Sequence, residues 1–139
     1  MHKKLIEDLY KTWNQDDLSA LDTLIAEDYT IHSDPGDAWE GKTLSRDEYR
    51  TRLLHSRKAF PDLVFETSQI VSEESFVAVI WTASGTHLGD LLGLPSTGKK
   101  LTFSGQTIYQ IKDGKVAGHW QVIDRLGFIQ QVSRAKLSG

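Results

Sequence analysis

Residues 106–116, QTIYQIKDGKV, decide the fold class of this chain. Apolar and polar side chains alternate along this stretch until Asp113-Gly114, the residue pair that most strongly favours a two-residue hairpin turn. The same two-residue period recurs through the second half of the sequence. The strands that it predicts cover residues 62–72, 75–86, 100–111 and 115–124. Because hairpin turns join neighbouring strands, we expect an antiparallel sheet.

The first half of the sequence has a helical period instead. Its apolar residues recur every three or four positions, which is typical of helices that bury one face. The expected elements are helices over residues 4–14, 18–25 and 45–60 and a short strand over residues 29–32. Asp16 or Asp17 is expected to cap the second helix, a capping box at Ser45 and Glu48 opens the third, and Pro61 ends it. Helices followed by an antiparallel sheet indicate an α+β fold, in which a strongly bent sheet with helices across one face forms a cone with a mouth.

Composition limits the classes of protein to which the chain can belong. Its 139 residues have the length of one domain, expected over residues 1–139, and 39% apolar with 25% charged residues is a globular mixture. The net charge of −3 argues against a nucleic-acid-binding protein, and the absence of cysteine excludes disulfides and thiolate metal sites. No apolar run is long enough for a transmembrane helix, and the N-terminus lacks a signal-peptide pattern. We therefore expect a soluble cytoplasmic domain that binds neither nucleic acid nor membrane.

The last predicted strand carries the main catalytic candidate. Side-chain alternation places Trp120, Val122 and Asp124 on one face and His119 on the other. An acid that shares a face with Trp and Val is unusual, because carboxylates are rarely buried without a partner. If that face points inward, loss of water favours the protonated carboxyl and makes Asp124 a usable acid and base. Alternatively, Asp124 is a solvated residue at the end of the strand or pairs with Arg125.

Other polar and aromatic side chains could line a cavity or its rim. These candidates are His32, Trp39, Trp81, His87, Gln106, Gln110, His119 and Trp120. Each has a structural alternative: His32 could point into water, His87 could bond its own loop, and Trp81 could belong to the core. Trp39 lies in a polar loop, where packing explains an aromatic side chain less easily, so it is a candidate lid over the mouth.

The usual motifs for nucleotide, metal and nucleophile sites are missing from the sequence. It contains no Gly-x-Gly-x-x-Gly, no P-loop and no Gly-x-Ser-x-Gly. His32-Ser33-Asp34 could supply two metal ligands, but a metal site needs more converging ligands than that. We therefore expect neither a metal nor a cofactor.

A long insertion between the second and third predicted strands gives the chain a family resemblance. Segments of this length inside a hairpin are often functional. The insertion and three later motifs, at residues 85–100, 103–105, 113–116 and 120–131, resemble the corresponding parts of SnoaL-like polyketide cyclases, within the NTF2-like superfamily. The similar pattern extends from the first helix to about Val132.

The resemblance implies a curved antiparallel sheet wrapped by three helices around an apolar pocket. In the characterised cyclases, an aspartate on the last strand takes a proton from an acidic carbon of an aromatic polyketide ester and later returns it. The enolate closes a ring by an aldol step, and no metal or cofactor takes part. The matching position here is Asp124. Polar partners surround the acid in these cyclases, and the candidates for that role here are His32, Gln106, Gln110 and His119.

The first hypothesis is therefore a cofactor-independent lyase or isomerase that acts on a small, mostly apolar carbonyl compound. Asp124 would be its acid and base, and His32 and Gln106 would orient the substrate or stabilise the enolate oxygen. The side chains expected to shape the pocket are Trp39, Trp81 and Trp120. One alternative is a non-catalytic module that binds a hydrophobic ligand, and another is hydration or hydroxylation in the same pocket. The resemblance also implies a homodimer, because the outer face of such a sheet commonly pairs in this superfamily. The apolar side chains of Phe76, Val77, Val79 and Ile80 on both faces of their strand fit this expectation, and the alternative is that they pack under the helices.

Overall fold

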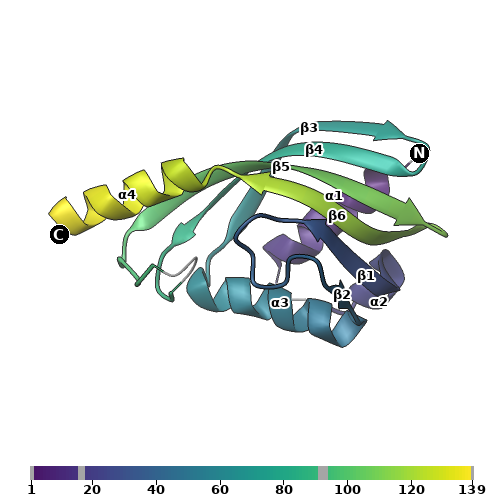
Figure 1. Ribbon diagram of the computed structural model, residues 1–139, viewed down its shortest axis with the longest axis horizontal. Helices are drawn as coiled ribbons and strands as arrows, with labels where there is room; N and C mark the ends of the chain where they lie inside the picture. The colour runs from purple at the N-terminus through teal and green to yellow at the C-terminus, as the bar shows by residue number, and fades with distance from the viewer. Residues whose placement is uncertain (1, 16–17, 91–93, 139) are drawn as a thin grey trace.

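The computed structural model describes residues 2–15, 18–90 and 94–138, with the backbone alone at residues 136 and 138. The described elements, in chain order, are α1 (Lys3–Asn14), α2 (Leu21–Leu24), β1 (Ile25–Ser33), β2 (Thr43–Leu44), α3 (Arg46–Ala59), β3 (Val64–Glu73), β4 (Phe76–Thr86), β5 (Lys100–Lys112), β6 (Lys115–Ile123) and α4 (Arg125–Ser138). Figure 1 shows these elements as a curved sheet with helices packed beneath it. The predicted α+β class is confirmed.

The six strands form one sheet in the order β2-β1-β6-β5-β4-β3. The four long strands β3 to β6 are antiparallel neighbours, as their two-residue period predicts. Asp113 and Gly114 both have positive φ, at 51° and 76°, which is the backbone that the predicted tight turn between β5 and β6 requires. The first strand, for which the sequence predicted no partner, runs parallel to β6.

Strand β1 also starts earlier than its sequence pattern predicts. It begins at Ile25, which is fully buried and pairs with Val116 of β6. This contact joins residues that are far apart in the sequence. Because β1 already begins at Ile25, the second helix has only four residues. The expected cap of that helix, Asp16 or Asp17, lies outside the described residues.

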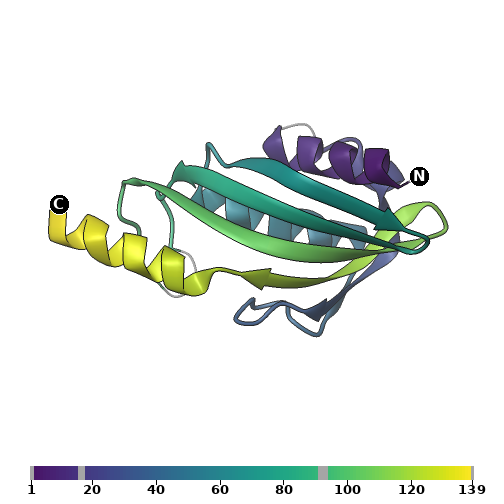
Figure 2. The same cartoon turned by 90° about the horizontal axis from the view of Figure 1, so that it is seen from above.

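Helices α1, α2 and α3 lie on the concave face of the sheet (Figures 1 and 2). The predicted capping box starts α3, since the backbone N–H of Glu48 donates to Ser45 Oγ at 3.1 Å and that of Ser45 donates to Glu48 Oε1 at 2.9 Å. Along α3, Tyr49, Arg52 and Leu53 share the buried stripe. The helix therefore places a charged guanidinium group beneath the sheet.

Helix α4, which the sequence pattern did not predict, projects from one end of the sheet (yellow in Figure 2). Only part of it packs on the body of the protein, through Phe128 and Val132. A hydrogen bond also links α4 to the sheet, because the backbone N–H of Thr102 in β5 donates to the side-chain oxygen of Gln131 at 2.8 Å. No helix among the described residues is long and apolar enough to cross a membrane.

Candidate functional site

A cavity of about 110 Å³ lies between the concave face of the sheet and helix α3. This volume far exceeds what a single water molecule needs. Aromatic side chains form most of its wall: Trp13, Tyr49, Phe60, Phe65, Trp81, Phe103, Tyr109 and Phe128. The polar lining consists of Tyr29, Asp37, Arg52, Ser56, His119, Gln121 and Arg125. An apolar hollow with a few converging polar groups is the usual form of a small-molecule site.

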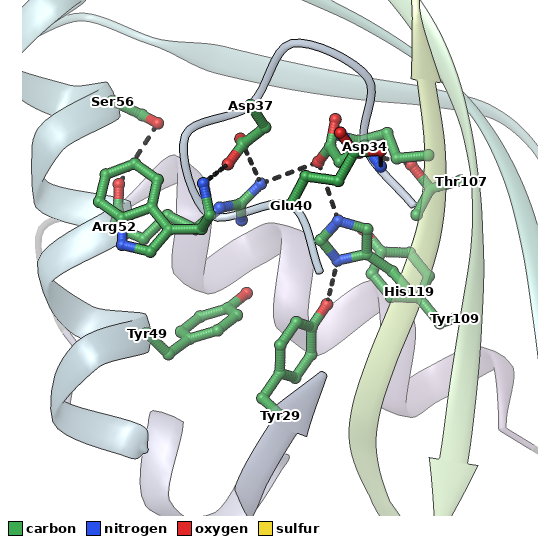
Figure 3. Close-up of polar contacts among 12 residues, drawn as sticks. Tyr29, Asp34, Asp37, Glu40, Tyr49, Arg52, Ser56, Thr107, Tyr109 and His119 are labelled. Atoms are coloured by element: carbon green, nitrogen blue, oxygen red, sulfur yellow. Dashed lines mark hydrogen bonds and ion pairs between the residues drawn. The ribbon is translucent and has the colours of Figure 1, made fainter. Parts of the chain in front are cut away.

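A buried carboxylate, Asp34, holds the polar side of this site together (Figure 3). It follows β1 and is only 1% exposed. Its Oδ2 accepts hydrogen bonds from His119 Nε2 at 2.9 Å, Gln121 Nε2 at 3.0 Å and Arg52 Nη2 at 3.2 Å. Three hydrogen-bond donors, one of them cationic, therefore converge on one carboxylate oxygen.

The contacts of His119 determine which of its ring nitrogens carries the proton. A carboxylate only accepts, so Nε2 carries the hydrogen that points to Asp34. Nδ1 is then the acceptor for the hydroxyl of Tyr29, at 2.6 Å. Burial lowers the pKa of His119, although the bond to Asp34 acts in the opposite direction. The imidazole is therefore neutral at pH 7 and sits in a chain that runs from Tyr29 through His119 to Asp34.

Arg52 links this chain to the loop that follows β1. Its Nη2 lies 3.2 Å from Oδ2 of Asp34 and 3.2 Å from Oδ2 of Asp37. Burial opposes its charge, but Asp37 and the neighbouring tyrosines and Asp34 raise the pKa of the guanidinium overall. Asp37 also accepts the backbone N–H of Trp39 at 2.8 Å. These bonds hold the loop against α3 at the side of the cavity.

The tyrosine hydroxyls in the cavity are protonated groups. Burial raises the pKa of Tyr29, Tyr49 and Tyr109. The Tyr49 hydroxyl accepts from Trp13 Nε1 at 2.9 Å, so it can still donate its own proton to a bound compound. Tyr109 instead donates to the hydroxyl of Tyr10 at 2.9 Å. Tyr49 thus keeps a proton to donate to an oxygen of a ligand, as does Tyr10, whose hydroxyl also accepts.

Two of the site residues predicted from the sequence line this cavity, Trp81 and His119. Trp81 is buried, and its indole N–H donates to Thr107 Oγ1 at 2.8 Å. Thr107 in turn donates to Gln121 at 2.7 Å. Both predicted residues belong to the wall, Trp81 on β4 and His119 on β6, with β5 between the two strands.

Asp124 does not lie in the cavity, so the condition for its predicted catalytic role, that its face of the strand points inward, is not met. Helix α3 covers the other face of β6, the one that carries His119. Asp124 is exposed, and its Oδ1 accepts the backbone N–H of Gly127 at 2.9 Å in the first turn of α4. It is the solvated carboxylate of the alternative reading, and it acts as a helix cap.

Four other predicted residues lie on the uncovered face of the sheet, opposite the cavity. They are His32, Gln106, Gln110 and Trp120. The ring of His32 stacks on Trp120 at 4.2 Å, and its Nε2 lies 2.9 Å from Gln110 Oε1. Their expected place in a pocket beneath the helices is therefore wrong, because strand alternation turns Tyr29 inward and His32 outward.

The last two predicted residues lie near the cavity without lining it. Trp39 is half-buried in the loop over α3 and packs edge-on against His55, at 5.5 Å. His87 is fully buried, and its ring lies 5.3 Å from that of Phe60 and 5.8 Å from that of Phe128. Since both phenylalanines are wall residues, His87 lies one layer behind the wall. Burial lowers the pKa of its imidazole.

The sequence reasoning missed several residues of the site as candidates for chemistry. They are Tyr29, Asp37, Tyr49, Arg52, Gln121 and Arg125, and Asp34 was weighed only as a metal ligand. One available signal was the position of Arg52, which falls on the apolar stripe of α3, where a charge needs a buried partner. Among the described residues, no group of three or more His, Asp and Glu side chains could hold a metal ion.

Comparison with known proteins adds to this geometry. The sequence model of the SnoaL-like polyketide cyclase family matches residues 3–132. Among solved structures, a candidate polyketide cyclase from Acidithiobacillus ferrooxidans is 37% identical with a TM-score of 0.87, covering 96% of this chain and 94% of that one. IdmH, a candidate polyketide cyclase from Streptomyces antibioticus, is 30% identical with a TM-score of 0.78, covering 94% and 96%. AclR, a candidate hydroxylase from Streptomyces galilaeus, is 28% identical with a TM-score of 0.77, covering 96% and 81%.

The similarity to characterised enzymes is shorter. Aklanonic acid methyl ester cyclase DnrD of Streptomyces peucetius is 42% identical over 50 residues, which are 34% of this chain and 33% of the cyclase. The corresponding cyclase DauD of Streptomyces sp. strain C5 matches over the same length. The chain thus aligns with about a third of the length of these curated relatives.

Proposed function

The chain belongs to the SnoaL-like polyketide cyclase family, and on this basis we propose that it is a cofactor-independent acid–base enzyme. Its substrate is a small, mostly apolar carbonyl compound that enters the aromatic cavity. The enzyme removes a proton from the carbon beside a carbonyl, and the enolate attacks a second carbonyl of the same molecule. Such an aldol-type ring closure is consistent with the cyclase names of the relatives.

One observation carries the proposal: Tyr29 and His119, which line the cavity, belong to a buried hydrogen-bonded chain that ends at Asp34. Polar side chains are costly to bury, even when they are hydrogen-bonded to one another. Packing alone therefore does not explain why three of them are buried beside an aromatic cavity. A carboxylate that orients a neutral histidine, which in turn accepts from a hydroxyl, is the arrangement of an activated proton-transfer group. A compound bound in the cavity would be the one on which these three hydrogen-bonded residues act.

In this proposal the proton moves along the chain. The hydroxyl oxygen of Tyr29 takes the proton from carbon while its own proton passes to Nδ1 of His119. Asp34 stabilises the resulting imidazolium through the N–H on Nε2, and the reverse transfer protonates the product oxygen. Concerted transfer avoids a free phenolate, which the raised pKa of Tyr29 disfavours. General acid–base catalysis of this kind supplies roughly 10²- to 10⁴-fold in rate.

Two further groups act on the oxygen of the substrate. Tyr49 donates its free hydroxyl proton to the enolate oxygen. Arg52 supplies a positive charge beside the chain, where it balances Asp34 and Asp37. Tyr49 and Arg52 both belong to α3, so their distances to His119 on β6 depend on how this helix packs on the sheet.

Proton exchange at carbon tests the proposal. Methyl acetoacetate is incubated with the protein in D₂O, and loss of the signal of the CH₂ group is followed by NMR against a buffer blank. We expect exchange above the blank in the wild type and a drop of about 100-fold in His119→Gln. Asp124→Asn is the matched control and retains the wild-type rate, because this side chain lies outside the cavity.

Thermal unfolding of each variant separates loss of chemistry from loss of folding. Wild-type exchange no faster than the blank rejects the enzyme, and ligand binding without exchange assigns the cavity to a binding module. Loss of exchange in Asp124→Asn alone transfers the proton-transfer role back to that residue.

We also propose that the uncovered face of the sheet pairs with a second copy of the chain. Large apolar side chains are exposed on β3, β4, β5 and β6: Val71, Phe76, Ile80, Ile108 and Val122. All of them except Phe76 line a groove across these strands, and Val122 is 65% exposed. Contiguous apolar surface of this kind is typical of protein–protein contacts. A self-complementary sheet face suits a two-fold dimer.

A further inference from the structure

We propose that the substrate of the cavity carries a carboxylate and that Arg125 binds it. This inference rests on the proposed function, because it names the class of compound on which the enzyme acts. A neutral ester, as in the names of the curated relatives, would leave the guanidinium group of Arg125 without a counter-charge. The substrate here would be a small keto acid with an apolar body.

The first reason is the state of the Arg125 guanidinium. Arg125 is the first residue of α4, and its side chain lines the cavity. Its Nη2 is buried, and no described residue offers it a hydrogen-bond acceptor. Arg50 and Arg52 differ in that each has a carboxylate partner: Arg50 pairs with Asp47 at 2.9 Å, and Arg52 pairs with Asp34 and Asp37, both at 3.2 Å. A buried cationic donor without an acceptor is costly, so a ligand oxygen is the natural partner.

The second reason is the position of Arg125 beside the loop that follows β1. Gly36, with φ of +85°, lies against the guanidinium, and a Cβ on this residue would come within 2.5 Å of Arg125 Cζ. The next residue, Asp37, bonds Arg52 at 3.2 Å. Because adjacent Cα atoms are about 3.8 Å apart, the two guanidinium groups lie at the same side of the cavity. A glycine at position 36 therefore leaves room for Arg125 there.

The third reason is the balance of charge at this side of the cavity. Arg52 contacts both Asp34 and Asp37, so these carboxylates already have a cationic partner. Arg52 Nε is also buried without an acceptor among the described residues. Arg125 thus has the one guanidinium on the cavity wall that contacts no carboxylate of the described chain. A carboxylate fits the planar fork of a guanidinium and accepts two parallel hydrogen bonds from it.

Binding of a matched pair of compounds tests the inference without any need for catalysis. Phenylacetate and phenylacetamide have nearly the same shape and differ in charge. Their affinities are measured by calorimetry, or by quenching of the tryptophans on the cavity wall. We expect the wild type to bind phenylacetate at least tenfold more tightly than the amide. In Arg125→Gln the preference should fall below about twofold while the affinity for the amide stays unchanged.

Controls separate this effect from a general disturbance of α4. Arg134→Gln changes an exposed arginine on the same helix and should keep the full preference. Arg125→Lys should keep part of the preference, since the charge remains but the fork is lost. Thermal unfolding shows whether Arg125→Gln is folded, and binding of the amide by the variant confirms that the cavity is intact.

Several results would overturn the inference. They are equal affinities for the two compounds in the wild type, no measurable binding of either, or a preference that survives in Arg125→Gln. Tighter binding of benzylphosphonate than of phenylacetate would overturn the assignment to a carboxylate. The experiments distinguish failure of this inference from failure of the proposed function. A preference for phenylacetate without proton exchange at carbon rejects the enzyme and keeps the carboxylate site. Proton exchange without this preference keeps the enzyme and rejects the carboxylate site.

Discussion

Nε2 of His119 lies 2.9 Å from Oδ2 of Asp34, although 85 positions separate the two residues in the sequence and both are buried. The bond joins the last strand of the sheet to the loop after the first, and Arg52 of α3 reaches the same oxygen. Three parts of the chain therefore meet at one carboxylate. The stability of the fold and the orientation of the proposed proton-transfer group depend on the same contact.

Asp34→Asn should lower the free energy of unfolding by about 1–3 kcal/mol, measured by urea denaturation. The amide removes the charge that faces Arg52, which keeps Asp37 as its partner, so the cost is that of weakening a buried charged hydrogen bond. Asp124→Asn replaces one exposed helix cap by another good one and should change stability by less than about 1 kcal/mol. Equal losses in the two variants would contradict the role assigned to Asp34.

Tyr29→Phe should reduce proton exchange at carbon by about 100-fold while the protein stays folded. The change removes only the hydroxyl that donates to His119 Nδ1, and the ring keeps its packing. Exchange is followed in D₂O as for His119→Gln, with circular dichroism to confirm the fold. Full activity in Tyr29→Phe would show that the proton does not pass through this hydroxyl.

Stability should decrease as the pH falls below about 6.5. Burial lowers the pKa of His119 in the folded protein, so the unfolded chain takes up a proton near the ordinary value of 6.5 while the folded one stays neutral. The contribution is complete above pH 6.5 and is lost below it, by at most about 1.4 kcal/mol per pH unit for one histidine. His87 acts in the same direction.

The comparison with His119→Gln isolates this effect. Urea denaturation between pH 5 and 7 should give a smaller slope of unfolding free energy against pH in the variant than in the wild type. The same slope in both proteins would mean that His119 does not stay neutral in the folded state.

Gly105→Ala should destabilise the protein by about 1–3 kcal/mol, the usual cost of overpacking. A methyl group at this position of β5 would collide with the six-membered ring of Trp81. The indole would have to move and lose its bond to Thr107, which tryptophan fluorescence would report. Adding Trp81→Phe should recover part of the loss, because the smaller ring leaves room for the methyl group; an additive double mutant would contradict this explanation.

Val122→Lys should convert the proposed dimer into a monomer, as measured by size-exclusion chromatography with light scattering. Val122 lies on the uncovered sheet face, where a charge at the centre of an apolar contact is unfavourable. Leu54→Lys is the matched control, since Leu54 is a comparably exposed apolar residue on α3, away from that face. A wild-type monomer, or a variant that remains dimeric, would reject the proposed interface.

The local features of the fold could be predicted from the sequence. The two-residue period gave the four long strands, Asp113-Gly114 gave the turn between β5 and β6, and Ser45 with Glu48 gave the start of α3. Each of these depends on residues close together in the chain, whose own conformational preferences decide the outcome.

The site depended on contacts that no local pattern contains. Alternation along β6 separated His119 from Asp124, but either face of a strand can be the buried one. Only the packing of α3 on the concave side decided that His119 faces the cavity and that Asp124 caps a helix in solvent. The sequence alone thus determined the strands, turns and helix starts. The tertiary structure decided which face of the strand is buried, because burial depends on long-range packing. It thereby also decided which acid is hydrogen-bonded to a histidine.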